Sequence, residues 1–192
     1  MKRVFIIHGW NGNPDEGWFP WLKSELEKNG FNVFTPAMPE PARPRIDEWV
    51  NKIKEEVGDS SEETYFVGHS IGSQAILRYL ETLNAWDKFG GVVLVAPWIN
   101  LKTGAEDEDD KEIARPWLET PINWGRAKDR AGKFVAIFSE NDPLVSLDDA
   151  KIFENKLGAK IILEGNKGHL GGSDGFKDLL SALEAILEMS KK

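Results

Sequence analysis

Short runs of β-branched and aromatic residues alternate with amphipathic segments along the chain, and this alternation constrains the fold more than any other feature of the sequence. The run at 91–96 is apolar at every position, as expected of a strand buried on both faces of a sheet. Other runs with the length and composition of strands lie at 4–7, 31–35, 64–67, 134–138 and 160–163. Strands that alternate with helices form parallel sheets covered on both faces. The sequence therefore predicts an α/β fold with a doubly wound, mostly parallel six-stranded sheet.

Helical periodicity fills most of the intervals between these runs. One helical face is marked by the i, i+3, i+4, i+7 spacing of Ile46, Trp49, Val50, Ile53 and Val57. Further helices are predicted at 18–28, 71–83 and 146–157. A closing helix is predicted to carry one apolar stripe of Phe176, Leu179, Leu180, Leu183, Ile186 and Leu187.

The alternation breaks down between residues 97 and 130, where we expect an irregular, cap-like insertion. At 192 residues the chain has the length of one domain, so residues 1–192 are predicted to form a single domain that includes this insertion.

A G-x-S-x-G pentapeptide, Gly68-His69-Ser70-Ile71-Gly72, stands between a predicted strand and a predicted helix. In this pattern the serine sits on a sharp turn that exposes its hydroxyl near the N-terminus of the helix, where the helix dipole favours negative charge. Glycines two positions before and after the serine avoid clashes between strand and helix. We therefore predict that Ser70 is a nucleophile.

A serine hydroxyl needs a base to remove its proton, and the sequence contains three histidines. His69 adjoins Ser70 on the sharp turn and is expected to point away from it, in a packing or supporting role. His8 ends the first predicted strand and is interpreted as structural. His169 lies between glycines in the loop after the last predicted strand, and is the predicted base.

The base needs an acid that holds its tautomer. Asp142 follows the fifth predicted strand, and its Asp-Pro step favours a turn that can aim the carboxylate inward. Glu140 is a nearby rival. We predict Asp142 as the acid.

An oxyanion hole needs two backbone N–H groups. One is expected at Ile71, directly after the nucleophile, and the second at Trp10 in the glycine-rich loop after the first strand, with Asn11 as the alternative. Trp98, Trp117 and Asn11 are the predicted lining of a substrate pocket, although the tryptophans could equally fill the core.

Together these motifs resemble the small serine hydrolases related to retinoblastoma-binding protein 9 and the bacterial YdeN proteins. The resemblance covers essentially the whole chain and includes His8-Gly9-Trp10, Val95-Ala96-Pro97 and the segment 139–143. It implies a compact α/β-hydrolase with a minimal cap and esterase activity. Matched by motif, it also implies a triad of Ser70, Asp142 and His169.

Composition excludes several other classes of function. The chain contains no cysteine, so disulfides and thiolate metal sites are excluded, and a cytoplasmic location is expected. Its formal net charge of −8 disfavours binding to nucleic acid or to an anionic membrane surface. No apolar run approaches the roughly 20 residues of a membrane span. No His or Asp cluster has the spacing of metal ligands, so neither a metal nor a cofactor is expected.

The sequence thus predicts a cofactor-free serine hydrolase that cleaves a small-molecule carboxylic ester through an acyl-enzyme. A thioesterase or an amidase would use the same residues. From a different class, a degenerate hydrolase could act as a protein-binding module, but such a module has no need of a complete triad.

Overall fold

The computed structural model describes residues 1–102 and 108–191. Within this part, six strands pair in parallel in the order β2-β1-β3-β4-β5-β6. The strands are β1 (Arg3–Ile7), β2 (Asn32–Phe34), β3 (Thr64–His69), β4 (Gly91–Val95), β5 (Phe134–Ser139) and β6 (Lys160–Glu164). The predicted doubly wound α/β sheet is confirmed, and every described strand pair is parallel. The strand order changes direction between β1 and β3, and in sheets of this kind ligands bind at the carboxyl ends of the strands beside such a switch.

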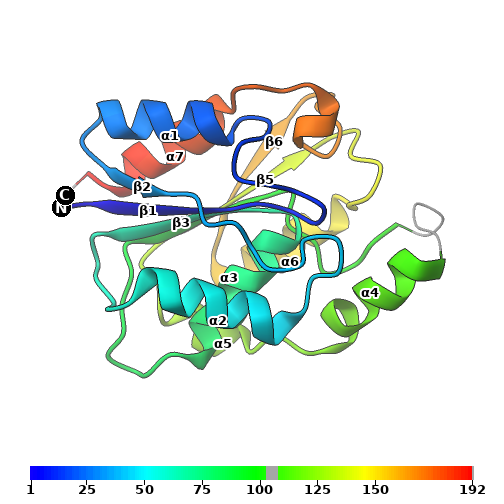
Figure 1. Cartoon of the computed structure of the whole chain (residues 1–192), viewed down its shortest axis with the longest axis horizontal. Helices are drawn as coiled ribbons and strands as arrows, with labels where there is room; N and C mark the ends of the chain where they lie inside the picture. Colours follow the sequence, from blue (N-terminus) through cyan, green and yellow to red (C-terminus); the bar gives the residue numbers. More distant parts are fainter. Residues whose placement is uncertain (103–107, 192) are drawn as a thin grey trace.

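Helices cover both faces of the sheet (Figure 1). One face carries α1 (Phe19–Lys28) and α7 (Leu180–Met189), and the other carries α2 (Ile46–Val57), α3 (Ile71–Thr82), α5 (Trp124–Lys128) and α6 (Asp148–Leu157). Because successive strand residues point to opposite faces, β1 supplies Val4 and Ile6 to one apolar core and Phe5 and Ile7 to the other. Among the described residues, no helix is both long and apolar enough to cross a bilayer.

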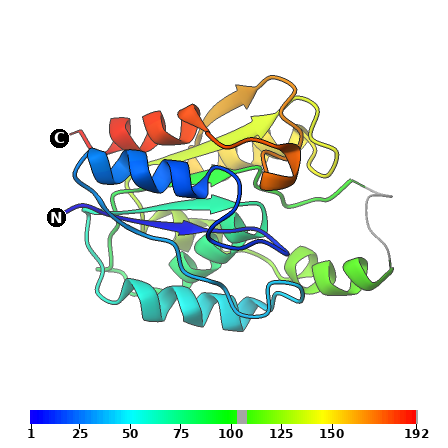
Figure 2. The same cartoon turned by 45° about the horizontal axis from the view of Figure 1, so that its top comes forward.

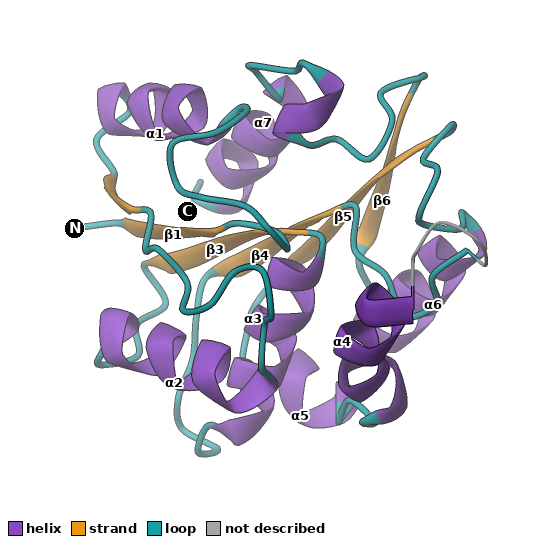
Figure 3. Cartoon of the chain, turned by 45° about the vertical axis from the view of Figure 1, so that its right-hand side comes forward, coloured by secondary structure: helices purple, strands orange, loops and turns teal. Residues whose placement is uncertain are grey.

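The segment predicted to be an irregular insertion contains two helices, α4 (Glu108–Glu119) and α5. Helix α4 lies beyond the carboxyl ends of the strands (Figures 2 and 3). Only Ala114 and Trp117 of α4 are buried, so its apolar periodicity is too weak to be recognised in the sequence. Five consecutive acidic residues occupy positions 106–110 of the sequence, and the first two of them belong to the segment 103–107, which lies outside the described part of the chain.

The predicted apolar stripe of the closing helix is only partly correct. Helix α7 begins at Leu180, so Phe176 and Leu179 precede it, and the side chain of Leu180 is 55% exposed. Leu183 and Ile186 are buried as expected. Small residues at 182 and 185 complete the buried face, and such residues give a weak signal in a periodicity analysis.

Candidate active site

The turn between β3 and α3 places Ser70 at the carboxyl edge of the sheet, at the N-terminus of α3. Ser70 has φ +52° and ψ −122°, a conformation that a residue with a side chain rarely adopts. Its N–H donates to the carbonyl of Val95 in the neighbouring strand (2.8 Å), and its carbonyl accepts from Ser73 N (2.9 Å). A strained residue of this kind costs about 1–3 kcal/mol and persists only where its surroundings impose it.

Two glycines allow the chain to make this turn. A Cβ atom on Gly68 would lie 2.7 Å from the backbone nitrogen of Ser73, and one on Gly72 would lie 2.5 Å from the carbonyl oxygen of His8. Both contacts are with backbone, which cannot move aside without displacing the strand or the helix. The structure thus bears out the steric reason for the G-x-S-x-G spacing.

Ser70, His169 and Asp142 form one hydrogen-bonded relay, although they come from three different strand-end loops. His169 Nδ1 lies 2.8 Å from Asp142 Oδ2, and His169 Nε2 lies 2.9 Å from Ser70 Oγ. Because the carboxylate can only accept, Nδ1 carries the proton, and Nε2 is left as the acceptor for the serine hydroxyl. The geometry therefore presents a serine hydroxyl aimed at Nε2, the ring nitrogen that can take its proton.

The surroundings of Asp142 keep it ionised. Burial by itself would raise the pKa of this carboxyl, but the hydrogen bond and charge of His169 and the N–H groups of Val145 and Leu144 outweigh burial and lower the pKa below its usual value. The two N–H groups donate to Oδ1 at 3.0 and 2.8 Å, so Oδ2 stays available to His169. The rival Glu140 is exposed.

The ring of His69 contacts the loop that carries the base and supports it. Its Nε2 lies 3.0 Å from the carbonyl oxygen of His169, so Nε2 must be the protonated nitrogen. Burial, together with the nearby His169, lowers the pKa of His69 to about 3. The imidazole is therefore neutral at physiological pH and acts as a fixed donor.

Trp18 and Asn141 also hold the His169 loop, and no pattern in the sequence predicts this role. Trp18 Nε1 donates to the carbonyl of Leu170 (2.8 Å). The side-chain oxygen of Asn141 accepts from Gly168 N (2.9 Å). His8, interpreted as structural, accepts from Met38 N through Nε2 (3.0 Å), and burial lowers its pKa.

The two expected oxyanion donors lie at the same strand edge. No hydrogen-bond acceptor for the backbone N–H of Ile71 or of Trp10 is present among the described residues. The N–H of Asn11, the alternative, donates to the carbonyl of Pro41 (2.8 Å) and is already engaged. The geometry favours Trp10 over Asn11 as the second donor.

A cleft of about 350 Å³ opens beside Ser70. Its lining includes Asn11 and Trp98 of the expected pocket residues, the expected oxyanion donor Trp10, and also Glu16 and Asp110. The structure contradicts the prediction for Trp117, which does not line the cleft. It is 2% exposed, packs edge-on against Trp49, and donates its indole N–H to the carbonyl of Pro44 (2.9 Å). Helix α4 turns this residue toward α2, where core packing buries the ring.

The indole of Trp98 contacts the nucleophile directly. Its Nε1 lies 3.2 Å from Ser70 Oγ, and the side chain is 2% exposed. The carbonyl of Trp98 accepts from Gln74 Nε2 (3.0 Å). The carboxylate of Asp149, which is buried, accepts from the backbone N–H groups of residues 99 (2.7 Å) and 100 (2.9 Å). Neither Gln74 nor Asp149 was identified from the sequence.

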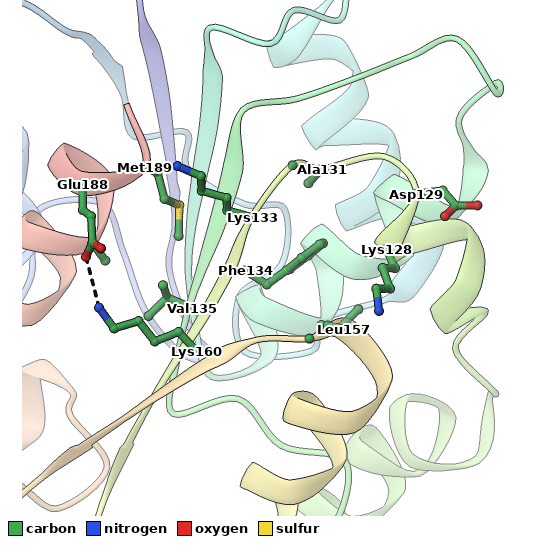
Figure 4. Close-up of a pocket in the computed structure, with 13 residues that line it drawn as sticks. Lys128, Asp129, Ala131, Lys133, Phe134, Val135, Leu157, Lys160, Glu188 and Met189 are labelled. Carbon is green, nitrogen blue, oxygen red and sulfur yellow. Dashed lines mark hydrogen bonds and ion pairs between the residues drawn. The ribbon is translucent and has the colours of Figure 1, made fainter. Parts of the chain in front are cut away.

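A larger cavity, of about 530 Å³, lies at the opposite, amino-terminal end of β5 and β6 (Figure 4). Lys133, Lys160 and Phe134 are among its lining residues, and Lys160 pairs with Glu188 (3.1 Å). It contains neither serine nor histidine and lies away from the carboxyl edge, so the smaller cleft is the candidate site. In the described part of the chain, no group of three or more His, Asp or Glu side chains is arranged to hold a metal ion.

Comparison with known proteins agrees with this geometry. The model of the serine hydrolase family matches residues 4–187. The chain belongs to the serine hydrolase family. This hydrolase is 29% identical to YdeN of Bacillus subtilis over 178 residues, which cover 93% of this chain and 90% of that protein. It is 25% identical to the serine hydrolase RBBP9 of Rattus norvegicus over 189 residues, covering 96% of this chain and 95% of the other.

Solved structures show the same fold. The hydrolase superimposes on the crystal structure of the YdeN protein of B. subtilis with a TM-score of 0.90 and 26% identity, with all of both chains covered. Est1E of Butyrivibrio proteoclasticus, solved with bound ferulic acid, matches with a TM-score of 0.74 at 14% identity, covering 98% of this chain and 87% of that one. The α/β-hydrolase fold and the family resemblance predicted from the sequence are thus confirmed.

Proposed function

We propose that this hydrolase cleaves a small carboxylic ester through an acyl-enzyme on Ser70. The observation that carries the proposal is the continuous relay from Asp142 Oδ2 through both ring nitrogens of His169 to Ser70 Oγ. The unengaged N–H groups of Ile71 and Trp10 at the same edge support it, because they can donate hydrogen bonds to the carbonyl oxygen that becomes negative during attack.

In the proposed reaction, Ser70 Oγ attacks the ester carbonyl while its proton passes to His169 Nε2. Asp142 stabilises the imidazolium that results. The carbonyl oxygen, now negative, accepts from the two backbone N–H groups. His169 then gives the proton to the leaving alkoxide as the C–O bond breaks. Water, deprotonated by His169, then attacks the acyl-serine. The acyl–Oγ bond breaks, Oγ takes the proton back from His169, and the carboxylic acid is released.

The size and charge of the cleft support a small, uncharged ester as substrate. About 350 Å³ is near the lower end of the roughly 300–1,000 Å³ that ligand sites occupy, so the cleft encloses a short acyl group and not a long chain. Its charged lining residues outside the relay are Glu16 and Asp110, which disfavour an anionic acyl group.

Two alternatives use the same site. A thioesterase or amidase would need the same relay, and only turnover separates these substrates. A binding module needs neither the strained backbone at Ser70 nor the aligned relay. Their presence therefore favours an enzyme.

The test combines an activity-based probe with a substrate panel. We expect a fluorophosphonate to label the wild-type protein and to leave Ser70→Ala unlabelled. Ser60→Ala, in the segment between α2 and β3, is the matched control and should be labelled as the wild type is. Turnover is then compared for 4-nitrophenyl acetate, the corresponding thioester and the anilide. A wild-type protein that neither reacts with the probe nor turns over any of the three would support the binding module and overturn the proposal.

A further inference from the structure

The hydrogen bond from Trp98 to Ser70 sets this tryptophan apart from the other buried ones. Trp18, Trp49 and Trp117 each donate the indole N–H to a backbone carbonyl oxygen, at 2.8, 2.8 and 2.9 Å. Trp98 donates instead to the hydroxyl oxygen of Ser70, at 3.2 Å. A buried indole N–H requires an acceptor, and here the acceptor is the nucleophile itself.

Several contacts hold the backbone that carries this indole. Ala96, two residues earlier, has φ +44°, an unusual value for a residue other than glycine, and it turns the chain sharply after β4. Gln74 of α3 holds the carbonyl of Trp98. Asp149 of α6 accepts the next two backbone N–H groups and the side-chain amide of Asn100 (2.8 Å). The backbone at Trp98 is thus anchored to α3 and α6, and burial of the side chain restricts rotation of the indole.

We infer that Trp98 is a catalytic residue whose indole N–H stabilises negative charge on Ser70 Oγ. This inference rests on the proposed acyl-enzyme reaction. Oγ has two lone pairs, of which one accepts from Nε1 and the other is free for attack, while the hydroxyl proton is directed to His169 Nε2. The indole proton is shared and never transferred, so the proton balance between Oγ, His169 and the leaving group is unchanged.

The charge on Oγ rises twice in each turnover. It rises during acylation, when the O–H bond breaks before the new C–O bond is complete. It rises again during deacylation, when that C–O bond breaks and its electron pair returns to Oγ. A donor that stays on Oγ therefore assists both steps. It acts on the nucleophile, whereas the N–H groups of Ile71 and Trp10 are placed for the carbonyl oxygen of the substrate.

This role differs in a measurable way from that of a pocket wall. A side chain that lines the pocket contacts the acyl group, so its removal changes the rates for different acyl chains by different factors. A donor to Oγ contacts the enzyme atom that reacts with every substrate, so its removal lowers the rate by the same factor for every acyl chain. A hydrogen bond to a charged group corresponds to about 10- to 100-fold in rate.

The test removes the N–H and keeps the ring. In Trp98→Phe we expect the burst rate (acylation) and the steady-state rate (deacylation) with 4-nitrophenyl acetate each to fall by about 10-fold or more. We expect both rates with 4-nitrophenyl butyrate to fall by the same factor as with the acetate. The burst amplitude should remain one acyl group per chain. The matched control is Trp117→Phe, which removes an equally buried indole N–H from a carbonyl remote from Ser70 and should leave both rates within about twofold of the wild type.

If Trp98→Phe does not fold, as judged by circular dichroism, 3-benzothienylalanine at position 98 preserves the shape of the indole without its N–H and carries the same expectations. Unchanged or faster rates would overturn the inference, because the bond would then be a feature of the resting enzyme alone. A loss that differs between acetyl and butyryl esters would also overturn it and make Trp98 a pocket wall. Undiminished hydrolysis of 4-nitrophenyl acetate by Ser70→Ala would refute the acyl-enzyme itself, and the inference with it.

Discussion

The neutral, buried His69 makes the stability of the fold depend on pH in a calculable way. Its pKa is lowered from 6.5 to about 3 in the folded protein, mainly by burial and then by the nearby His169, with His8 acting in the same direction and Asp142 against it. Between these two pH values the unfolded chain binds a proton at residue 69 and the folded chain does not. The free energy of unfolding therefore falls as the pH drops below about 6.5, and it continues to fall until the pH approaches 3.

The size of the effect follows from 1.36 kcal/mol per pH unit. When the pH is lowered from 7.5 to 5.0, about 1.5 pH units of this change lie below the pKa of residue 69 in the unfolded chain. Protonation at His69 alone therefore lowers the free energy of unfolding by about 2 kcal/mol. The variant His69→Gln provides the comparison, because its side-chain amide can still donate to the carbonyl of His169 but does not titrate.

Urea unfolding of both proteins at the two pH values measures this contribution. The wild type should lose about 2 kcal/mol more than His69→Gln between pH 7.5 and 5.0. The contribution of His8, whose pKa is also lowered, is present in both proteins and cancels in the comparison. Equal losses in the two proteins would show that His69 is protonated in the folded state and would refute the reasoning.

Substitutions at four other positions test the site and its supports. Ser70→Ala or His169→Ala should each lower kcat by several orders of magnitude, and the double variant should lose little more, because the two side chains act as one unit; independent, multiplying losses in steady-state assays would contradict this. Asp149→Ala leaves two backbone N–H groups without their acceptor and should lower the free energy of unfolding by about 2–4 kcal/mol, measured in urea; a loss below about 0.5 kcal/mol would show that the loop relaxes freely. Gly72→Ala places a Cβ 2.5 Å from a backbone carbonyl of the loop after β1, so both the melting temperature and the activity should fall, and an unaffected melting temperature would contradict the steric argument.

Much of this architecture follows from local sequence patterns combined with topology. Continuous apolar runs such as 91–95 mark buried parallel strands, and parallel strands end at one edge of the sheet. Residues that directly follow a strand are thereby placed near one another without any knowledge of distances. Ser70, Asp142 and His169 were predicted in this way, and in the structure they lie within hydrogen-bond distance.

The remaining features depend on contacts that no local pattern encodes. In the sequence, Asp149 is typical of the acidic residues in the first turn of a helix. In the structure, its carboxylate accepts hydrogen bonds from a loop about fifty residues earlier in the chain. Trp98 and Trp117 belong to the same insertion and have the same residue type, but one contacts the nucleophile and the other fills the core. Their difference is set by the direction of α4, which has too few buried residues to be predicted.

The acyl-enzyme on Ser70 is the central claim, and it can be observed directly. The wild-type protein is mixed with 4-nitrophenyl acetate, quenched in acid within the burst phase, digested and analysed by mass spectrometry. We predict one acetyl group on the peptide that contains Ser70, and the loss of that adduct when the quench is delayed until the substrate is exhausted. Hydrolysis of the ester with an unmodified Ser70 peptide throughout the burst, or with the acetyl group on another residue, would contradict the account.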